Sequence, residues 1–216
     1  DQFETVVIEE FFKHFYPEHP YGQNPVLGKS EHIKNPSLTK MREYYEKYYR
    51  AGNMALILSG NFNPDRVKDW IDKYFSKLQD GEPEEKDKEK PEQFEGREVV
   101  TKRLTPVRAG LIAFRTVPYN HPDKLKIEVL HNLLTNNNQT GMLDKLGQDN
   151  ELLYSLAVND IREDAGASVF LFVPKIIFQS FRKAENIVID EIEKIKKGKF
   201  PEEKLEAVKI NMKKDF

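Results

Sequence analysis

A strongly charged segment near the middle of the chain limits where a hydrophobic core can form. Residues 80–96 read DGEPEEKDKEKPEQFEG and combine almost no apolar side chains with charges of both signs. A stretch of this composition cannot bury enough apolar surface to offset the entropy lost on ordering it. We therefore predict a solvated linker over residues 80–96, so that any core must be built from residues 1–79 or from residues 97–216.

Before the linker, three runs have apolar residues at helical spacing. The first run ends at Pro17, the second begins near Ser37, and the third has Asn63 as its N-cap and Pro64 in its first turn. Residues 54–60 (MALILSG) are almost entirely apolar, which is typical of a strand covered on both faces. Because a single strand leaves backbone groups unpaired along both edges, we expect this first part to be an incomplete domain that borrows strands.

After the linker, strands and amphipathic helices alternate. The predicted strands are residues 97–104, 109–117, 152–160 and 166–174, and the predicted helices are residues 121–135, 141–148, a long helix through Phe178, Phe181 and Ile195 closed by Gly198, and a last helix opened by Pro201. This order predicts an α+β fold, in which antiparallel sheets carry helices packed on one face, rather than a doubly wound parallel fold.

The composition excludes several classes of function. With 216 residues, 38% of them hydrophobic, and a net charge of −2, the chain can build a core and has no general attraction to nucleic acid or to anionic membranes. No apolar run approaches the roughly 20 residues that a membrane helix needs. The absence of cysteine excludes disulfides, thiol catalysis and cysteine-ligated zinc. No glycine-rich nucleotide-binding motif occurs.

The segment HFYPEHPYG brings His14, Glu18 and His19 close together in sequence. Zinc motifs on helices, H-E-x-x-H and H-x-x-E-H, place two histidines four residues apart so that both imidazoles share one helix face. Here the histidines are five residues apart, which turns the second ring about 140° away from the first. Pro17 also disfavours helix just before itself. We therefore interpret the segment as a helix that ends in a turn.

The remaining candidate ligands have simpler interpretations. Glu9 and Glu10 could be proposed as metal ligands, but glutamates on an amphipathic helix are usually solvated. His131 lies on a predicted helix with no second ligand four residues away, which favours a packed or half-exposed side chain. His32 and His121 lie in predicted loops without partners. No residue is therefore assigned as a metal ligand.

Several segments share their order and spacing with a known family. They read FYPEHPYGQNPVLGKSEHI, YYEKYYRAGNMALILSGNFNPDRV and YFSKL, followed after the linker by LLTNNNQTGMLDKLGQDNELLYSLAV. Together they resemble the pitrilysin/insulinase family of inverted zinc metallopeptidases. The resemblance covers nearly the whole chain except the linker. It implies that residues 1–79 are the C-terminal part of a first peptidase-like repeat, and that residues 97–216 are the first part of a second, inactive-type repeat.

The resemblance also implies where the chemistry lies. Family members hold zinc through H-x-x-E-H and a later glutamate, both upstream of a structural HPYG loop, and the glutamate of the motif activates a water molecule. No H-x-x-E-H occurs in these 216 residues. The expectation is therefore that the chain has no catalytic residue, metal ligand or cofactor of its own and is inactive alone, whereas zinc belongs to the full-length parent.

Tyr154 is the candidate substrate-binding residue. In the non-zinc halves of the family, an arginine and a tyrosine seven residues later help to hold the substrate against the opposing zinc site. Tyr154 matches that tyrosine, but the arginine position is Gly147, and the nearest cation, Lys145, is out of register. A partly buried tyrosine at the edge of the core is the alternative interpretation.

Two main functions follow from the resemblance. The first is a non-catalytic segment of a zinc metalloendopeptidase that forms part of a peptide-enclosing chamber, with the peptide substrate and the remaining repeats or a homologous subunit as partners. The second is a scaffold or binding subunit of a family member that lacks the zinc motif. An unrelated α+β binding module is a more remote reading.

We predict that limited proteolysis cuts first between Gly81 and Glu95, because that segment has too few apolar residues to be held against a core. Mass spectrometry of the first fragments identifies the cut. Protection of this segment, with first cleavage inside residues 54–60, would show that the linker is assigned to the wrong place.

Overall fold

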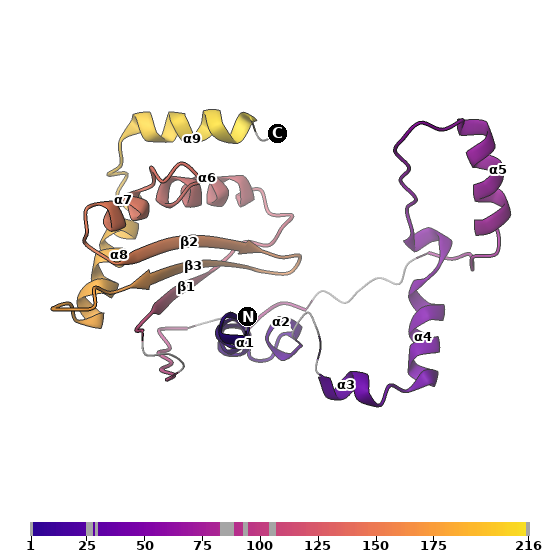
Figure 1. Ribbon diagram of the computed structural model, residues 1–216, viewed down its shortest axis with the longest axis horizontal. Helices are drawn as coiled ribbons and strands as arrows, with labels where there is room; N and C mark the ends of the chain where they lie inside the picture. The colour runs from indigo at the N-terminus through magenta and orange to yellow at the C-terminus, as the bar shows by residue number, and fades with distance from the viewer. Residues whose placement is uncertain are drawn as a thin grey trace. The chain divides into compact units, whose positions relative to one another are not determined.

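The computed structural model (Figure 1) describes residues 2–24, 28, 30–82, 89–92, 95–103 and 107–214. The chain forms two compact units. One, here named the sheet unit, consists of Glu89–Phe216 together with Asp1–Val7. The other, named the helical unit, is Ile8–Lys88.

The helical unit contains short and medium helices whose ends follow the sequence signals. They are α1 (Gln2–Phe15, which begins in the sheet unit), α2 (Pro20–Gln23), α3 (Ser30–Lys34), α4 (Leu38–Tyr48), the 3-10 turn η1 (Ala51–Asn53) and α5 (Pro64–Phe75). The predicted cap Asn63 is confirmed, because its Oδ1 accepts the backbone N–H of Arg66 at 3.1 Å. The helix predicted to begin near Ser37 does so, and Ser37 is its cap, with Oγ accepting the backbone N–H of Lys40 at 3.3 Å. Each bond satisfies a donor that the first helical turn leaves unpaired.

The strand predicted for residues 54–60 is wrong, since this segment has no assigned secondary structure. A strand forms only where a neighbour takes up its backbone hydrogen bonds. Among the described residues of the helical unit, β pairing is confined to an isolated bridge between Arg50 and Gln79. Apolar composition alone therefore did not make this segment a strand, and Ile57 is 88% exposed.

The apolar faces of α4 and α5 are exposed in this structure, although the sequence pattern predicts that they point inward. The side chains include Met41 and Tyr45 on α4 and Trp70 and Tyr74 on α5. Most of the stability of a helix in a protein comes from packing such a face. The described residues thus supply amphipathic helices without the surface that would cover them. This supports the view that residues 1–79 are an incomplete domain, which stays a prediction.

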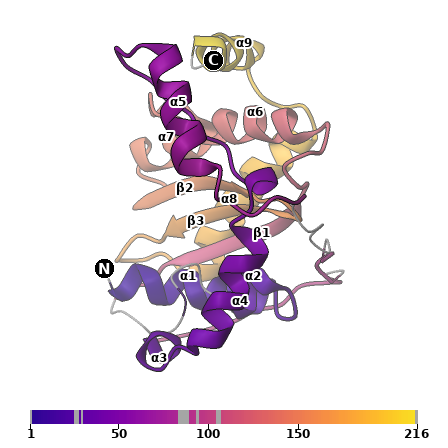
Figure 2. The same cartoon turned by 90° about the vertical axis from the view of Figure 1, so that its right-hand side faces the viewer.

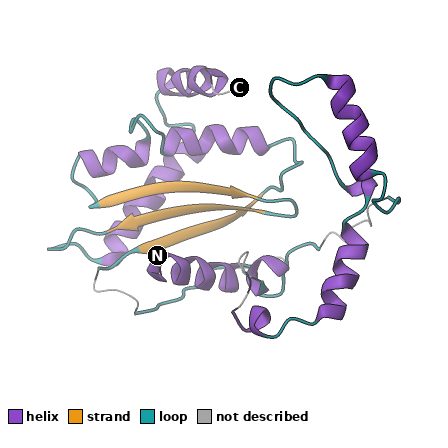
Figure 3. Cartoon of the chain, turned by 45° about the vertical axis from the view of Figure 1, so that its right-hand side comes forward, coloured by secondary structure: helices purple, strands orange, loops and turns teal. Residues whose placement is uncertain are grey.

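The sheet unit has a three-stranded antiparallel sheet in the order β1-β3-β2 (Figure 3). Its elements are β1 (Gly110–Thr116), α6 (Lys124–Leu134), α7 (Met142–Gln148), β2 (Tyr154–Ile161), β3 (Gly166–Val173), α8 (Phe181–Lys196) and α9 (Glu202–Lys214). The strands predicted at 109–117, 152–160 and 166–174 are confirmed. The strand predicted at 97–104 is wrong for residues 97–103, which have no assigned strand, and residue 104 lies outside the described residues.

The helices that follow β1 pack on one face of this sheet. In β3, Ser168, Phe170 and Phe172 are buried on the face that α6, α7 and α8 cover, while Val169 and Leu171 lie on the opposite face. Helix α9 packs against α6 and forms an outer layer, as Figure 2 shows. The α+β class with helices on one face is therefore confirmed.

The hydrophobic core lies between the sheet and its helices. Its fully buried members include Leu134, Leu143, Phe172 and Val188, which come from α6, α7, β3 and α8. Burial of a side chain of this size contributes about 1.5–3 kcal/mol. The core thus holds α6, on which His131 lies, against the sheet, and β2, on which Tyr154 lies, packs against the core through Ala157.

The long helix was predicted to include Phe178, which is wrong because the helix begins later. Helix α8 begins at Phe181, after the N-cap Ser180, whose Oγ accepts the backbone N–H of Lys183 at 3.2 Å. Phe178 precedes the helix and has a φ of 64°, in the left-handed region. Its apolar side chain fitted the helical pattern by spacing, but its backbone conformation is not helical.

Part of the predicted linker, residues 83–88 and 93–94, lies outside the described residues. The two units divide at this segment, between Lys88 and Glu89, and also between Val7 and Ile8. The assignment of residues 1–79 and 97–216 to two repeats of a peptidase stays a prediction. Among the described helices, none is both long enough and apolar enough to cross a membrane.

Candidate functional site

Tyr154 is the first residue of β2 and lies opposite Val173 at the end of β3. The next residue, Ser155, is buried on the helix-covered face, where its hydroxyl donates to the carbonyl oxygen of Leu143 at 2.8 Å. Because side chains alternate along a strand, Tyr154 belongs to the opposite face. Its side chain is 48% exposed. The structure thus places the predicted substrate residue at an accessible rim of the sheet.

The position that corresponds to the family arginine lies on α7. A Cβ atom added to Gly147 would meet no heavy atom within 4 Å, so packing does not require glycine there. Lys145 lies on the same helix as Gly147. Its side chain points to Asp149, with 3.9 Å between Nζ and Oδ2. It forms a solvent-exposed ion pair, which contributes little stability. Gly147 thus carries no charge, and Lys145 is paired with Asp149 on its own helix.

The histidines of the HPYG region have structural roles. His19 is the buried N-cap of α2, and its Nδ1 accepts the backbone N–H of Tyr21 at 3.2 Å. A Cβ on Gly22 would lie 2.1 Å from the carbonyl oxygen of Tyr16, so only glycine fits this turn. His14 forms a pair with Glu10, with 3.6 Å between Nε2 and Oε2. The loop is thus a packed helix connection.

The other candidate ligands are also dispersed. His121 accepts the backbone N–H of Asp123 through Nδ1 at 3.1 Å. Glu9, Glu18 and His32 are exposed. Within the part of the chain that the structure describes, no group of three or more histidine, aspartate or glutamate side chains could hold a metal ion.

His131 is packed inside the sheet unit, which agrees with the first of the two interpretations, a packed rather than a half-exposed helix residue. Its Nε2 and Ser168 Oγ share a hydrogen bond of 2.7 Å, and its ring stacks on Phe170 with 5.6 Å between centroids. Its Nδ1 is buried without a hydrogen-bond partner among the described residues. Burial lowers the pKa of His131 to about 4, because the charged form would lose its hydration. The imidazole is therefore neutral at physiological pH.

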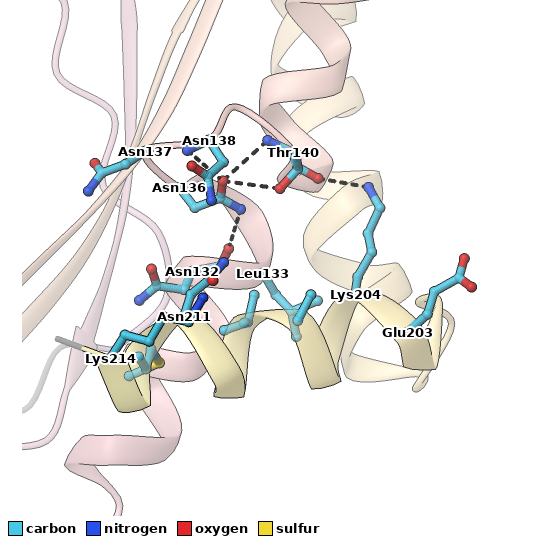
Figure 4. A pocket seen from close by; sticks show the side chains of 13 residues that line it. Asn132, Leu133, Asn136, Asn137, Asn138, Thr140, Glu203, Lys204, Asn211 and Lys214 are labelled. Atoms are coloured by element: carbon cyan, nitrogen blue, oxygen red, sulfur yellow. Dashed lines mark hydrogen bonds between the residues drawn. The ribbon is translucent and has the colours of Figure 1, made fainter. Parts of the chain in front are cut away.

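The structure also contains a pocket that the sequence analysis did not identify (Figure 4). Its volume is about 380 Å³, and its lining comes from α6, the loop 135–141 and α9. Lys204 reaches from α9 and donates through Nζ to the carbonyl oxygen of Thr140 at 2.8 Å. Asn136 Oδ1 accepts the backbone N–H groups of Asn138 and Thr140 at 3.1 and 3.2 Å. These polar side chains build the loop itself.

Only the loop on one side of this pocket has a signal in the sequence, which is the run NNNQT after a helix with an apolar face. Asparagine side chains bond to nearby backbone groups and thereby stabilise tight loops. The run predicts an ordered polar loop, but it carries no information that α9, about sixty residues later in the chain, closes the other side. The pocket therefore required the structure.

A family model described as the peptidase M16 inactive domain matches residues 36–212. The zinc protease PqqE of Helicobacter pylori is 26% identical over 214 residues, which covers 95% of this chain and 47% of that protein. The ubiquinol-cytochrome-c reductase complex core protein I of Euglena gracilis is 34% identical over 115 residues, or 50% of this chain and 22% of that protein. The chain thus spans about half the length of the PqqE relative.

A solved structure gives the same result for the fold. The crystal structure of a protease from Helicobacter pylori superposes with a TM-score of 0.75 at 22% sequence identity, covering 98% of this chain and 52% of that chain. At this level of identity the likeness establishes the fold.

The buried imidazole of His131 makes stability depend on pH. The folded pKa of about 4 lies below the ordinary value of 6.5, so the unfolded chain binds the proton more readily. The neutral imidazole contributes fully to the free energy of unfolding above about pH 6.5, and this contribution, on the order of 3 kcal/mol in total, is lost as the pH falls towards 4. We expect urea unfolding to give a free energy of unfolding that decreases from pH 6.5 to pH 5, and we expect His131→Gln to make this decrease smaller. His32→Gln, at an exposed position, is the control, and an equal decrease in His131→Gln and in the unsubstituted chain would contradict the prediction.

Proposed function

Because the chain belongs to the peptidase M16 family and matches its inactive domain, we propose that it is a non-catalytic segment of a zinc metalloendopeptidase. In this proposal the sheet unit forms part of the wall of a chamber that encloses peptides. Its partners are the peptide substrate and the remaining repeats of the parent, or a homologous subunit. The PqqE relative, which is a zinc protease about twice as long, supports this assignment.

The observation that carries the proposal is the sheet face opposite α6, α7 and α8. Leu111, Tyr154 and Val158 lie on this face and are 39%, 48% and 44% exposed. The reverse side of this face is packed, so the face is a rigid apolar surface. Strand β2 is at one end of the described sheet, and an extended peptide can add to such an edge with alternate side chains turned to this face. Tyr154, which matches the substrate-binding tyrosine of the family, therefore lies on a face that can contact a peptide.

In this proposal zinc belongs to the parent, because the PqqE relative is named a zinc protease. Among the described residues, His19 uses Nδ1 as a helix cap and His14 is paired with Glu10 on α1, so the two histidines do not form a zinc site together. This chain then takes no zinc-dependent step. Its role is positioning: a peptide held extended beside a reactive centre reacts as though the step were intramolecular, which can reduce the barrier by several kcal/mol.

A scaffold or binding subunit is the second candidate. The chain is similar, over half of its length, to core protein I of a reductase complex, a protein named for its place in an assembly. This similarity favours the scaffold. The Gly147 position, which lacks the family arginine, does not separate the two candidates. The presence of H-x-x-E-H elsewhere in the parent separates them, because the enzyme needs the motif and the scaffold does not.

We predict that the full-length parent hydrolyses a quenched fluorescent peptide and loses this activity on zinc chelation, whereas the 216-residue chain neither cleaves the peptide nor binds stoichiometric zinc. Metal analysis and the fluorescence assay on both proteins test this. Zinc bound by the isolated chain, and lost in a His14→Ala and His19→Ala double variant, would overturn the assignment. A parent without H-x-x-E-H and without activity would leave the scaffold.

We expect Tyr154→Phe in the full-length parent to lower kcat/KM several-fold, because the hydroxyl group that would contact the peptide is lost while the ring remains. Zinc content should not change. Tyr119→Phe is the matched control, since Tyr119 is 56% exposed and precedes α6. If Tyr154→Phe leaves kcat/KM unchanged, the prediction is wrong, and Tyr154 has only a structural role at the edge of the core.

A further inference from the structure

The pocket between α6 and α9 combines an apolar floor with a polar rim (Figure 4). Leu133 and Val208 are only 4% and 6% exposed and form the floor, to which the half-buried Met212 adds a flexible thioether. Amide and ammonium groups make up most of the rim. With a volume of about 380 Å³, the pocket lies near the lower end of the usual range for small-molecule sites. It therefore suits a compact ligand that is apolar at one end and polar at the other.

The charged side chains that line the pocket favour a negatively charged ligand. Lys204 and Lys214 bring two positive charges, whereas Glu203 brings one negative charge. In Figure 4 Glu203 points away from the loop, while the ammonium group of Lys204 reaches it. The bond from Lys204 Nζ to the carbonyl oxygen of Thr140, at 2.8 Å, uses one of the three N–H groups of the ammonium. The half-buried ammonium is thus held at the rim, and a carboxylate is the acceptor with which it forms the stronger, charge-assisted hydrogen bond.

Asparagine amides add groups that can bind a neutral polar part of the ligand. Asn211 lines the pocket from α9 and is exposed, so its amide is accessible to a ligand. Asn132 lines it from α6, and its Nδ2 donates to the carbonyl oxygen of Glu128 at 2.9 Å, which fixes the side chain. An amide has both a donor and an acceptor, as a peptide group has. The rim can therefore bond a peptide group as well as a carboxylate.

The pocket is separate from the sheet face of the proposed function. Helix α6 covers the face on which Ser168 and Phe170 are buried, and α9 packs on α6 as the outer layer. Leu111, Tyr154 and Val158 lie on the opposite face. A ligand between α6 and α9 therefore leaves that face open, and its binding is independent of peptide cleavage.

We propose that this pocket is an accessory binding site for a small carboxylic acid with an apolar body. The C-terminal residue of a peptide and a short-chain fatty acid both have this chemistry. The carboxylate bonds to Lys204 Nζ, and the apolar body lies on Leu133, Val208 and Met212. Binding needs both parts, because a charge pair in contact with water contributes little by itself and burial of the apolar body adds the rest.

Isothermal titration calorimetry of the full-length parent with N-acetyl-leucine tests the site. N-acetyl-leucinamide, which lacks the negative charge, and N-acetylglycine, which lacks the apolar side chain, should each bind roughly tenfold more weakly. Lys204→Met removes the ammonium group, and Asn211→Asp adds a negative charge at an exposed position. Both variants should bind N-acetyl-leucine roughly tenfold more weakly and N-acetyl-leucinamide as before. Lys209→Met is the matched control and should change neither affinity, because Lys209 lies on the same helix outside the pocket lining and is paired with Glu206.

A further probe, 4-methylpentanoate, identifies the source of the ligand, because it has the carbon skeleton of leucine without the peptide group. If it binds as tightly as N-acetyl-leucine, and the two variants weaken both, the site takes a fatty acid. If it binds more weakly, the site takes the end of a peptide. Equal affinity of the parent for N-acetyl-leucine and its amide overturns the proposal, and so does an affinity for N-acetyl-leucine that Lys204→Met and Asn211→Asp both retain. A parent that binds none of the probes overturns it as well.

Discussion

The hydrogen-bond ladders on both sides of β3 hold the sheet unit together, because β1 and β2 each pair with β3 and not with each other. The strand also supplies Phe170 and Phe172 to the core, so pairing and packing depend on the same residues. Close contacts restrict its surroundings. A Cβ on Gly110 would lie 2.3 Å from the ring of Phe172, and one on Gly166 would lie 2.3 Å from Thr116 Oγ1. The partner strand and the first residue of β3 must therefore be small at these points.

Local signals in the sequence were sufficient wherever the cause of a structure is local. Ser37 and Asn63 were predicted as helix starts because a cap needs only a side-chain oxygen and the next turn of backbone. Strands β2 and β3 were found for a related reason, since each has the apolar pattern and they pair with each other across a short turn. Strand β1 has the pattern too, but its partner β3 follows much later in the chain. Residues 54–60 have the pattern without a partner among the described residues, and sequence pattern cannot reveal whether a partner exists.

The candidate site was only partly accessible from the sequence. Tyr154 was identified through the family resemblance, and alternation along β2 predicts which face it occupies. Its neighbourhood could not be predicted, because a hydrogen bond from Gln179 Nε2 to the carbonyl oxygen of Glu151 joins residues 28 positions apart. Phe178 illustrates the same limit: its spacing suits the stripe of α8, and only the backbone angle shows that the helix has not yet begun. Contacts that close long loops leave no periodic trace in the sequence.

The buried pair of His131 and Ser168 has a consequence for how the sheet assembles. If β3 paired one residue out of register, its side chains would change faces, so that Ser168, Phe170 and Phe172 would leave the helix-covered side and Val169 and Leu171 would replace them. The imidazole of His131 would then lose both its bond to Ser168 and the stacked ring of Phe170. Because its Nδ1 already has no hydrogen-bond partner among the described residues, neither ring nitrogen would be bonded, which costs about 1–3 kcal/mol. The polar contact between α6 and β3 thus adds to the loss of the two phenylalanines, and both penalise a misaligned sheet during folding.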